Sequence, residues 1–470
     1  MIGGGLAGLA ASVALAESGW QVRLHEQRPY LGGRATSYVL PDGQHVDNCQ
    51  HVTFGCCTNL DDFYRRAGSA GKIRFFDRMT LQDPQGRRGV LQASYLPAPL
   101  HLVPSFLFFT PLGLRDKLSI ARAVWVILRS GGRPADLRNG ERVSMLEWLR
   151  RRKQTPRAIE RFWRAVLVSA LAEELDRTDA QYGVDVIWKA VLSNRNGCRM
   201  GVPEVPLADL YEQCRITVER MGGAVLLRSP ARALRFQRGA FAGVEFDGRA
   251  VERAAACVLA TPSDVAEKLL PESLRVSDPV FSNLKNLNSS PITGIHLWFD
   301  RKVMDEPHLA LLDTQTQWIF NKSLLYGHLA EKDATQYLQL VVSASYDFLE
   351  KPRQEIIDLC LRELRHALPA ARDAAVVKAI VIKEVAATMR PEPGVDRWRL
   401  PQQTHIPGLF LAGDWTATGW PATMEGAVRS GYLAAEAVLR AAGEPRQFLQ
   451  PELPQERLVR FLAKSNGEKS

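Results

Sequence analysis

Hydrophobic positions near the start of the chain repeat at the spacing of an α-helix and then alternate as in a β-strand. Residues 9–17 continue an apolar helical face, and Gly19 ends the helix. Residues 20–26 alternate between apolar and polar side chains, which predicts a strand. Helix and strand patterns return together over 207–227 and over 408–427. Helices that alternate with short buried strands predict an α/β fold.

The turn before the first helix carries a Gly-x-Gly-x-x-Gly motif formed by Gly3, Gly5 and Gly8. The first glycine permits the tight turn, the second lets the backbone approach a pyrophosphate, and the third lets helix and strand pack closely. Glu26 ends the next strand, where its carboxylate can accept hydrogen bonds from ribose hydroxyls. This order predicts a dinucleotide-binding unit. Only two residues precede Gly3, whereas a strand normally has about five to six residues, so we expect the sequence to begin inside the first strand.

Two further motifs can reach the same nucleotide. A second glycine turn ends in Gly33 and Arg34, whose cation can pair with the pyrophosphate. Near the other end, an apolar strand ends in Gly413 and Asp414, where the carboxylate can accept from a ribityl hydroxyl. The helix that opens over 421–427 points its positive end at the strand tip, where it would stabilise a reduced flavin anion. These motifs indicate FAD rather than NAD.

Composition and charge narrow the class of protein. The 470 residues suit two or three domains, and 46% hydrophobic with 24% charged residues is typical of a globular protein. The net charge of +9 favours an anionic membrane surface or a phosphorylated ligand, but it is spread along the chain, so we expect no nucleic-acid partner. Seven sparse cysteines argue for a reducing cytoplasm, and no cluster has metal-ligand spacing, so we expect no metal. No basic region precedes the apolar start, so we expect no signal peptide.

The stretch from 89 to 114 has no formally charged residue and contains four prolines, which prevent a regular membrane-spanning helix. Phe106, Phe108 and Phe109 lie within it, and basic residues follow it directly. Two interpretations remain open. Residues 96–114 either line a buried substrate site, or dip into the lipid interface while the basic residues meet headgroups.

The motifs at the two ends resemble the FAD-binding fold of the amine oxidase and phytoene desaturase superfamily. The resemblance implies an α/β fold in which a discontinuous, Rossmann-like FAD-binding domain carries an inserted α+β substrate domain. It also implies that the backbone near Ala231 meets the adenine. The predicted FAD-binding domain covers 1–95, 200–265 and 385–445, the substrate domain covers 96–199 and 266–384, and a polar tail covers 446–470. The predicted cofactor-binding residues are Gly3, Gly5, Gly8, Glu26, Gly33, Arg34, Ala231, Gly413, Asp414, Thr423 and Met424.

Two longer segments, 43–64 and 413–431, are similar to one subgroup, the hydroxysqualene dehydroxylases of bacterial hopanoid biosynthesis. The resemblance implies a hydrophobic isoprenoid substrate whose hydroxyl is removed reductively, giving squalene and water. Hydroxide is a poor leaving group, so a general acid should assist. Four residues are candidates for it: His45, Asp47, His51 and Glu425. Each also suits a purely structural hydrogen bond, and the sequence does not choose among them.

Three other functions remain open. A carotenoid-type desaturase would use oxidised flavin to remove hydride from a polyene precursor. An amine oxidase could use Trp415 and Trp420 as walls of an amine cage, although packing is the simpler role for both. A non-catalytic flavin-binding partner in a lipid-synthesis complex is the third. The resemblance further predicts a peripheral position on the inner membrane, with other squalene-synthesis enzymes as possible partners.

Overall fold

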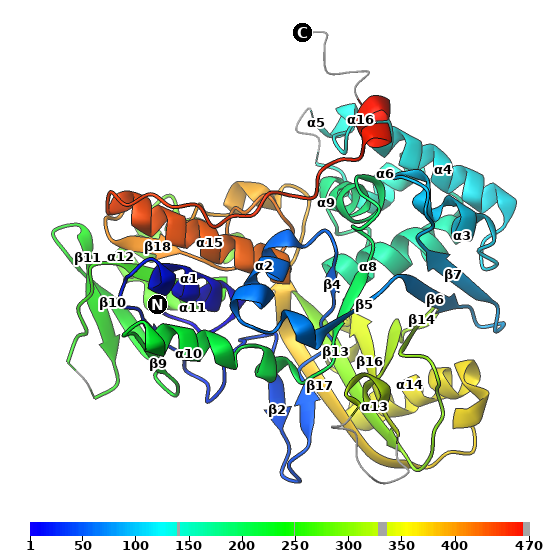
Figure 1. The fold of residues 1–470 in the computed structure, drawn as a ribbon, viewed down its shortest axis with the longest axis horizontal. Coiled ribbons are helices and arrows are strands. Elements are labelled where there is room, and N and C mark those ends of the chain that lie inside the picture. Colours follow the sequence, from blue (N-terminus) through cyan, green and yellow to red (C-terminus); the bar gives the residue numbers. More distant parts are fainter. Residues whose placement is uncertain (139–141, 249, 328–335, 464–470) are drawn as a thin grey trace.

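The computed structural model describes residues 1–138, 142–248, 250–327 and 336–463 (Figure 1). A parallel sheet forms the centre of the nucleotide-binding part. In it β1 pairs with β9 and β12 pairs with β18, and Ile2 bridges the two pairs through His25 and Leu259. Ile2 therefore occupies the central strand position in front of the glycine turn. The elements of this part are α1 (Leu6–Glu17), β1 (Arg23–His25), α10 (Glu212–Arg220), β9 (Ala224–Leu226), β10 (Ala231–Gln237), β11 (Ala240–Phe246), β12 (Cys257–Leu259), α11 (Ser263–Leu269), α12 (Glu272–Ser277), β18 (Leu409–Leu411) and α15 (Met424–Ala441).

Helices α1 and α15 lie side by side, so the two ends of the chain meet in one layer (Figure 1). Their contact is close because Gly431 has no side chain: a Cβ there would lie 2.3 Å from the Ala7 carbonyl oxygen. Ala10 is fully buried in the same contact. The first and last predicted elements thus form one packed unit.

A seven-stranded sheet in the order β17-β13-β16-β15-β14-β6-β7 forms the second part. One of its faces packs against α14, where Ile295, Leu297 and Phe299 meet Ile356 and Leu364 in a buried core. The intervening side chains of β13 point to the opposite face, because successive strand residues alternate. The elements are β6 (Arg78–Gln82), β7 (Arg88–Gln92), β13 (Ser289–Phe299), β14 (His308–Leu311), β15 (Trp318–Asn321), α13 (Lys322–Leu325), β16 (Gln336–Ser343), α14 (Arg353–Ala367) and β17 (Val376–Met389).

A helical part adjoins the sheet (Figure 1). Its core gathers Trp148, Trp163 and Leu167, all fully buried. Its helices are α3 (Val103–Leu107), α4 (Leu114–Arg129), α5 (Ala135–Arg138), α6 (Met145–Arg151), α7 (Pro156–Ala158), α8 (Ala165–Leu171), α9 (Ala180–Val186) and α16 (Arg457–Ala463). The remaining elements link the parts: β2 (Ser37–Val39), β3 (His45–Asp47), β4 (Thr53–Phe54), α2 (Thr58–Arg66), β5 (Ile73–Phe76) and β8 (Met200–Pro203).

The structure departs from the predicted domain limits at β6, β7 and the tail. Strands β6 and β7, which the limit at residue 95 assigns to the FAD-binding domain, instead extend the seven-stranded sheet through β14. The predicted tail is also more than a polar extension: Phe448 and Val459 are buried, and α16 packs on α4. Its last residues, 464–470, lie outside the described residues, as do 139–141, 249 and 328–335 of the predicted domains.

The uncharged stretch has both buried and exposed aromatic side chains. Phe109 is 1% exposed and belongs to the helical core, Phe106 contacts Phe162 edge-on, and Phe108 is 83% exposed. Only Phe108 of the three phenylalanines is therefore available to a lipid surface. Among the described residues, no helix combines the length and hydrophobicity needed to span a bilayer.

Candidate active site

Two of the three motif glycines are required by packing within the protein. Gly3 has a φ of +105°, and a Cβ there would lie 2.4 Å from the Ala260 carbonyl oxygen. A Cβ at Gly8 would lie 1.9 Å from the Gly3 carbonyl oxygen. The first helix can therefore approach the turn only because residue 8 has no side chain.

Gly5 differs because the protein leaves space beside it. The nearest atom to a Cβ built there is the Gly33 Cα, 3.8 Å away. Gly5 is also the N-cap of α1, and in the described structure no side chain caps that helix. An uncapped helix N-terminus beside an open glycine fits a pyrophosphate group, which would take up the free N–H groups.

Glu26 closes the other side of the glycine turn. Its carboxylate accepts the Gly4 backbone N–H at 2.7 Å and the Arg28 backbone N–H at 2.8 Å, one on each oxygen. The Ser229 backbone N–H donates to the Glu26 carbonyl oxygen at 2.8 Å, so the segment leading to Ala231 runs alongside. This arrangement brings the predicted ribose and adenine positions together at the end of β1.

Arg34 and Asp414 come from opposite ends of the sequence and form an ion pair of 2.6 Å. Arg34 also donates to the Ala387 carbonyl oxygen at 3.0 Å. The sequence predicts separate contacts of these residues with the pyrophosphate and the ribityl chain, whereas the structure pairs them with each other. The pair joins the two predicted halves of the cofactor site directly.

The end of β18 is tied to the start of α15. The Gly413 backbone N–H donates to Ser430 Oγ at 2.8 Å, and a Cβ at Gly413 would lie 2.4 Å from Trp415 Nε1. Thr423 Oγ1 accepts the Gly426 backbone N–H at 3.1 Å and so caps α15, whose first residue is Met424. The strand tip and the positive end of α15 thus lie together, as the motif predicts.

Asp47 lies in a buried polar cluster. One carboxylate oxygen accepts from Lys322 Nζ at 2.6 Å and from the Tyr326 hydroxyl at 2.5 Å, and the other accepts from Ser37 Oγ at 2.7 Å. Burial raises the pKa of Asp47, but the Lys322 ammonium and these hydrogen bonds outweigh burial and hold the pKa below its ordinary value. Sequence reasoning missed Lys322 and Tyr326. A lysine two residues after the apolar run 318–320 is the signal that could have indicated a buried cation.

Comparison with known proteins decides the family. Residues 6–439 match a family described as flavin-containing amine oxidoreductases. The chain belongs to this family. The glycine turn, the open position at Gly5 and the α15 terminus fit its cofactor, which is FAD.

Relatives and solved structures agree on the fold. Zeta-carotene desaturase from Synechocystis is 26% identical over 471 residues, covering 93% of this chain and 96% of that protein. A 15-cis-phytoene desaturase from Capsicum annuum is 26% identical over 464 residues, covering 93% and 77%. The crystal structure of an oxidoreductase from Methanosarcina mazei has a TM-score of 0.71 at 17% identity, covering 93% and 99%. The predicted α/β amine oxidase-like fold is thereby confirmed.

The two candidate histidines of this flavoprotein have different surroundings. His45 is exposed near the turn of the β2–β3 hairpin, which projects from the body of the molecule (Figure 1). An imidazole in water is poorly placed to protonate a group in a buried site, so the structure argues against His45. The Nδ1 of His51 is 2.9 Å from the Cys49 carbonyl oxygen, and burial lowers the pKa of the ring. His51 is therefore neutral near pH 7.

Glu425 acts as a cap for another helix. Its carboxylate accepts the Leu60 backbone N–H at 2.7 Å, and the Asn59 side-chain and backbone N–H groups at 2.9 and 3.3 Å. These N–H groups belong to the first turn of α2, which has no side-chain cap at its own N-cap residue Cys57. Both oxygens are thus occupied, which argues against Glu425 as the proton donor.

Replacing Glu425 by glutamine should therefore lower the stability of the fold and leave the reaction rate nearly unchanged. We expect the free energy of unfolding to fall by about 1–3 kcal/mol, because an amide NH₂ would face the Leu60 N–H and leave it unpaired. Turnover per bound flavin should stay close to that of the parent. Urea unfolding and single-turnover rates measure the two effects, and a lost rate at unchanged stability would contradict the capping role.

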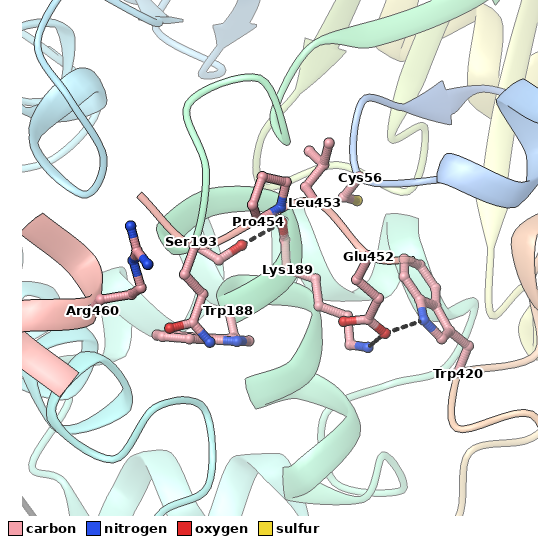
Figure 2. A pocket seen from close by; sticks show the side chains of 10 residues that line it. Cys56, Trp188, Lys189, Ser193, Trp420, Glu452, Leu453, Pro454 and Arg460 are labelled. Atoms are coloured by element: carbon pink, nitrogen blue, oxygen red, sulfur yellow. Dashed lines mark hydrogen bonds and ion pairs between the residues drawn. The ribbon is translucent and has the colours of Figure 1, made fainter. Parts of the chain in front are cut away.

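The two tryptophans do not form an amine cage. Trp415 is 2% exposed and donates through Nε1 to the Thr261 carbonyl oxygen at 2.8 Å. Trp420 donates through Nε1 to Glu452 at 2.7 Å, and Lys189 Nζ lies 4.5 Å from its ring centroid while pairing with the same carboxylate. Trp420, Lys189 and Glu452 line a cavity of about 450 Å³ between the helical part and the C-terminal segment (Figure 2). Its ion-paired wall suits water better than an apolar substrate.

Proposed function

We propose that this FAD-dependent oxidoreductase removes the hydroxyl group of hydroxysqualene reductively and releases squalene and water. The likeness of 43–64 and 413–431 to the hydroxysqualene dehydroxylases supports the proposal. The observation that carries it is the contact between these two segments, in which Glu425 accepts the Leu60 N–H at 2.7 Å. The two segments that resemble this subgroup therefore belong to one structural unit beside the predicted FAD-binding site.

The reaction needs one hydride and one proton for each hydroxyl that leaves as water. Reduced FAD supplies the hydride when bound. The C–O bond lies beside a double bond, so the departing water leaves a delocalised cation, and protonation of the oxygen makes it a better leaving group. The buried Lys322 ammonium donates hydrogen bonds to the ionised Asp47 carboxylate and to the Tyr326 hydroxyl. It therefore holds a proton inside the apolar interior. This cluster is the proton source in the proposed reaction.

Desaturation of a carotene precursor is the second candidate. The names of the relatives, zeta-carotene desaturase and 15-cis-phytoene desaturase, favour it more than they favour dehydroxylation. Both reactions use a long, acyclic isoprenoid. They differ in the direction of hydride transfer, because desaturation reduces the flavin whereas dehydroxylation oxidises it.

Product analysis separates the candidates. The chemically reduced holoenzyme is incubated without oxygen with hydroxysqualene, and the oxidised holoenzyme with phytoene or zeta-carotene. Squalene formed in proportion to flavin oxidation supports dehydroxylation, and a more desaturated polyene supports the second candidate. Peroxide release from an amine indicates an amine oxidase. Absence of all these products would overturn both proposals and leave a flavin-binding partner protein.

We also propose that the surface around 95–125 contacts an anionic membrane, from which an apolar substrate can enter. Nine of the 19 large apolar side chains that are exposed in the described part of the chain lie in this stretch, including Tyr95 at 97%, Phe108 at 83% and Leu114 at 72%. Arg115 and Arg122 are exposed beside them. Apolar side chains flanked by cations are typical of a surface that lies in the interface of an anionic bilayer.

Replacing Tyr95 and Phe108 together by serine should weaken sedimentation with phosphatidylglycerol vesicles by about tenfold or more, because each buries a large aromatic surface in lipid. The matched control replaces Val276 and Val385, which are 64% and 60% exposed elsewhere, by serine. Equal vesicle binding by the parent and both variants would contradict this surface.

A further inference from the structure

Two polar side chains lie next to each other on the face of the large sheet that is opposite α14. His296 on β13 and Gln339 on β16 are partners in the strand register, so their side chains project from the same face. This face looks toward the segment that follows Asp47: a Cβ at Gly294 would lie 3.5 Å from His296 Nε2 and 3.2 Å from the Asn48 carbonyl oxygen. The pair therefore lies on the side of the sheet where segment 47–51 packs.

Neither side chain has satisfied its hydrogen bonds. His296 and Gln339 are both 0% exposed. In the described part of the chain, His296 Nε2 and both amide atoms of Gln339 have no partner, although His296 Nδ1 is 2.7 Å from the Tyr337 hydroxyl. Buried polar groups are nearly always paired in folded proteins. Three unpaired atoms on neighbouring strands indicate a ligand that supplies the missing partners.

The surroundings define the chemistry of that ligand. The adjacent positions on this face are Val341 and Phe320, and the Trp298 ring stacks on Tyr337 with centroids 4.3 Å apart. Burial lowers the pKa of His296 to about 3, so the ring is neutral and does not attract an anion. A neutral imidazole and an amide that both donates and accepts suit a hydroxyl group on an otherwise apolar molecule.

We propose that His296 and Gln339 form a subsite that binds the hydroxyl group of an isoprenoid alcohol. The inference rests on the proposed function, because it takes the substrate to be hydroxysqualene rather than a hydrocarbon. A carotene precursor has no polar atom and would leave all three atoms unpaired. Sites built to pair a hydroxyl strongly reject the analogue that lacks it. The subsite thus selects the alcohol over its deoxygenated product, which also favours release of squalene.

The test compares the binding of hydroxysqualene and squalene to the oxidised holoenzyme, in which no dehydroxylation occurs, through the change in flavin absorbance. We expect the parent to bind the alcohol at least about tenfold more tightly. In Gln339→Leu, and in His296→Leu as a second variant, this ratio should fall to about one. The thermal midpoint of ligand-free Gln339→Leu should rise, since an unpaired buried amide is removed. The control Gln82→Leu should lower it, because both amide atoms of Gln82 are paired, with the Ala367 carbonyl oxygen and Arg88.

The outcomes keep the two proposals apart. A binding ratio that is unchanged in both variants, or a parent without any preference, overturns the subsite even if squalene is produced. A ratio that collapses in the variants supports the subsite even if no turnover is found, in which case the dehydroxylase proposal alone fails.

Discussion

Gly5→Val is expected to yield a folded protein that purifies without colour. Position 5 has an ordinary φ of −75°, and the nearest atom to its Cβ is 3.8 Å away, so the protein itself tolerates a side chain. The valine would occupy the space between the helix N-terminus and the pyrophosphate. We expect FAD affinity to fall by about 100-fold or more, because charge-assisted hydrogen bonds to the α1 N–H groups are lost.

The control for this experiment is Gly71→Val, at an exposed glycine with nothing within 4 Å of a built Cβ. It should retain stoichiometric FAD, as measured by the flavin absorbance of the purified protein. In Gly8→Ala, by contrast, we expect the fold itself to be disrupted, because the alanine Cβ would collide with the Gly3 carbonyl oxygen. A yellow Gly5→Val protein at full FAD occupancy would show that the phosphates lie elsewhere.

Local chemistry explains what the sequence could predict. The glycine motif, the helix after it and the strand that leads to Glu26 lie in one short stretch, and the structure has α1 and β1 in the predicted order. Gly239 forms the turn between β10 and β11, with a φ of +79° that favours glycine. Backbone conformation and the period of hydrophobic positions depend on such short stretches, so one sequence is enough to predict them.

Contacts between distant segments could not be read in this way. Asp47 meets Lys322 across 275 positions, and Arg34 meets Asp414 across 380. Both carboxylates looked free to serve a ligand because their partners sit in unrelated stretches. Strands β6 and β7 join the substrate sheet for the same reason: strand pairing is set by tertiary packing, which no local pattern records.

Asp47→Asn is expected to cause a large loss of stability. The change removes the only charge that the structure places against the Lys322 ammonium within hydrogen-bond distance in the described residues, where both side chains are at most 1% exposed. Breaking a buried pair by removing one partner costs about 3–5 kcal/mol. We expect a fall of this size in the free energy of unfolding from urea curves at pH 7.

The pH dependence of the free energy of unfolding tests whether the broken Asp47–Lys322 pair causes the lost stability. In the parent, the pKa of Asp47 is lowered, so its contribution is present above about pH 4 and is lost as pH falls through the folded pKa. Burial lowers the pKa of Lys322 in the parent although Asp47 opposes this, so removing the carboxylate should lower the pKa further below its unfolded value of about 10.4, and the unfolded variant binds more protons. Stability of the variant should therefore rise more than that of the parent as pH increases from 7 towards 10, because the parent keeps the carboxylate that raises the Lys322 pKa.

Two further variants complete the test. The double variant Asp47→Asn with Lys322→Met should recover much of the lost stability, because no unpaired charge then remains buried. Asp42→Asn serves as the surface control: Asp42 pairs with Lys378 in an exposed position, so its loss should change stability little at any pH. If Asp47→Asn were as stable as Asp42→Asn at pH 7, then Lys322 would carry no charge beside Asp47 in the native protein. It would then have no proton to give to a departing hydroxyl, and the proposed proton source would fail with it.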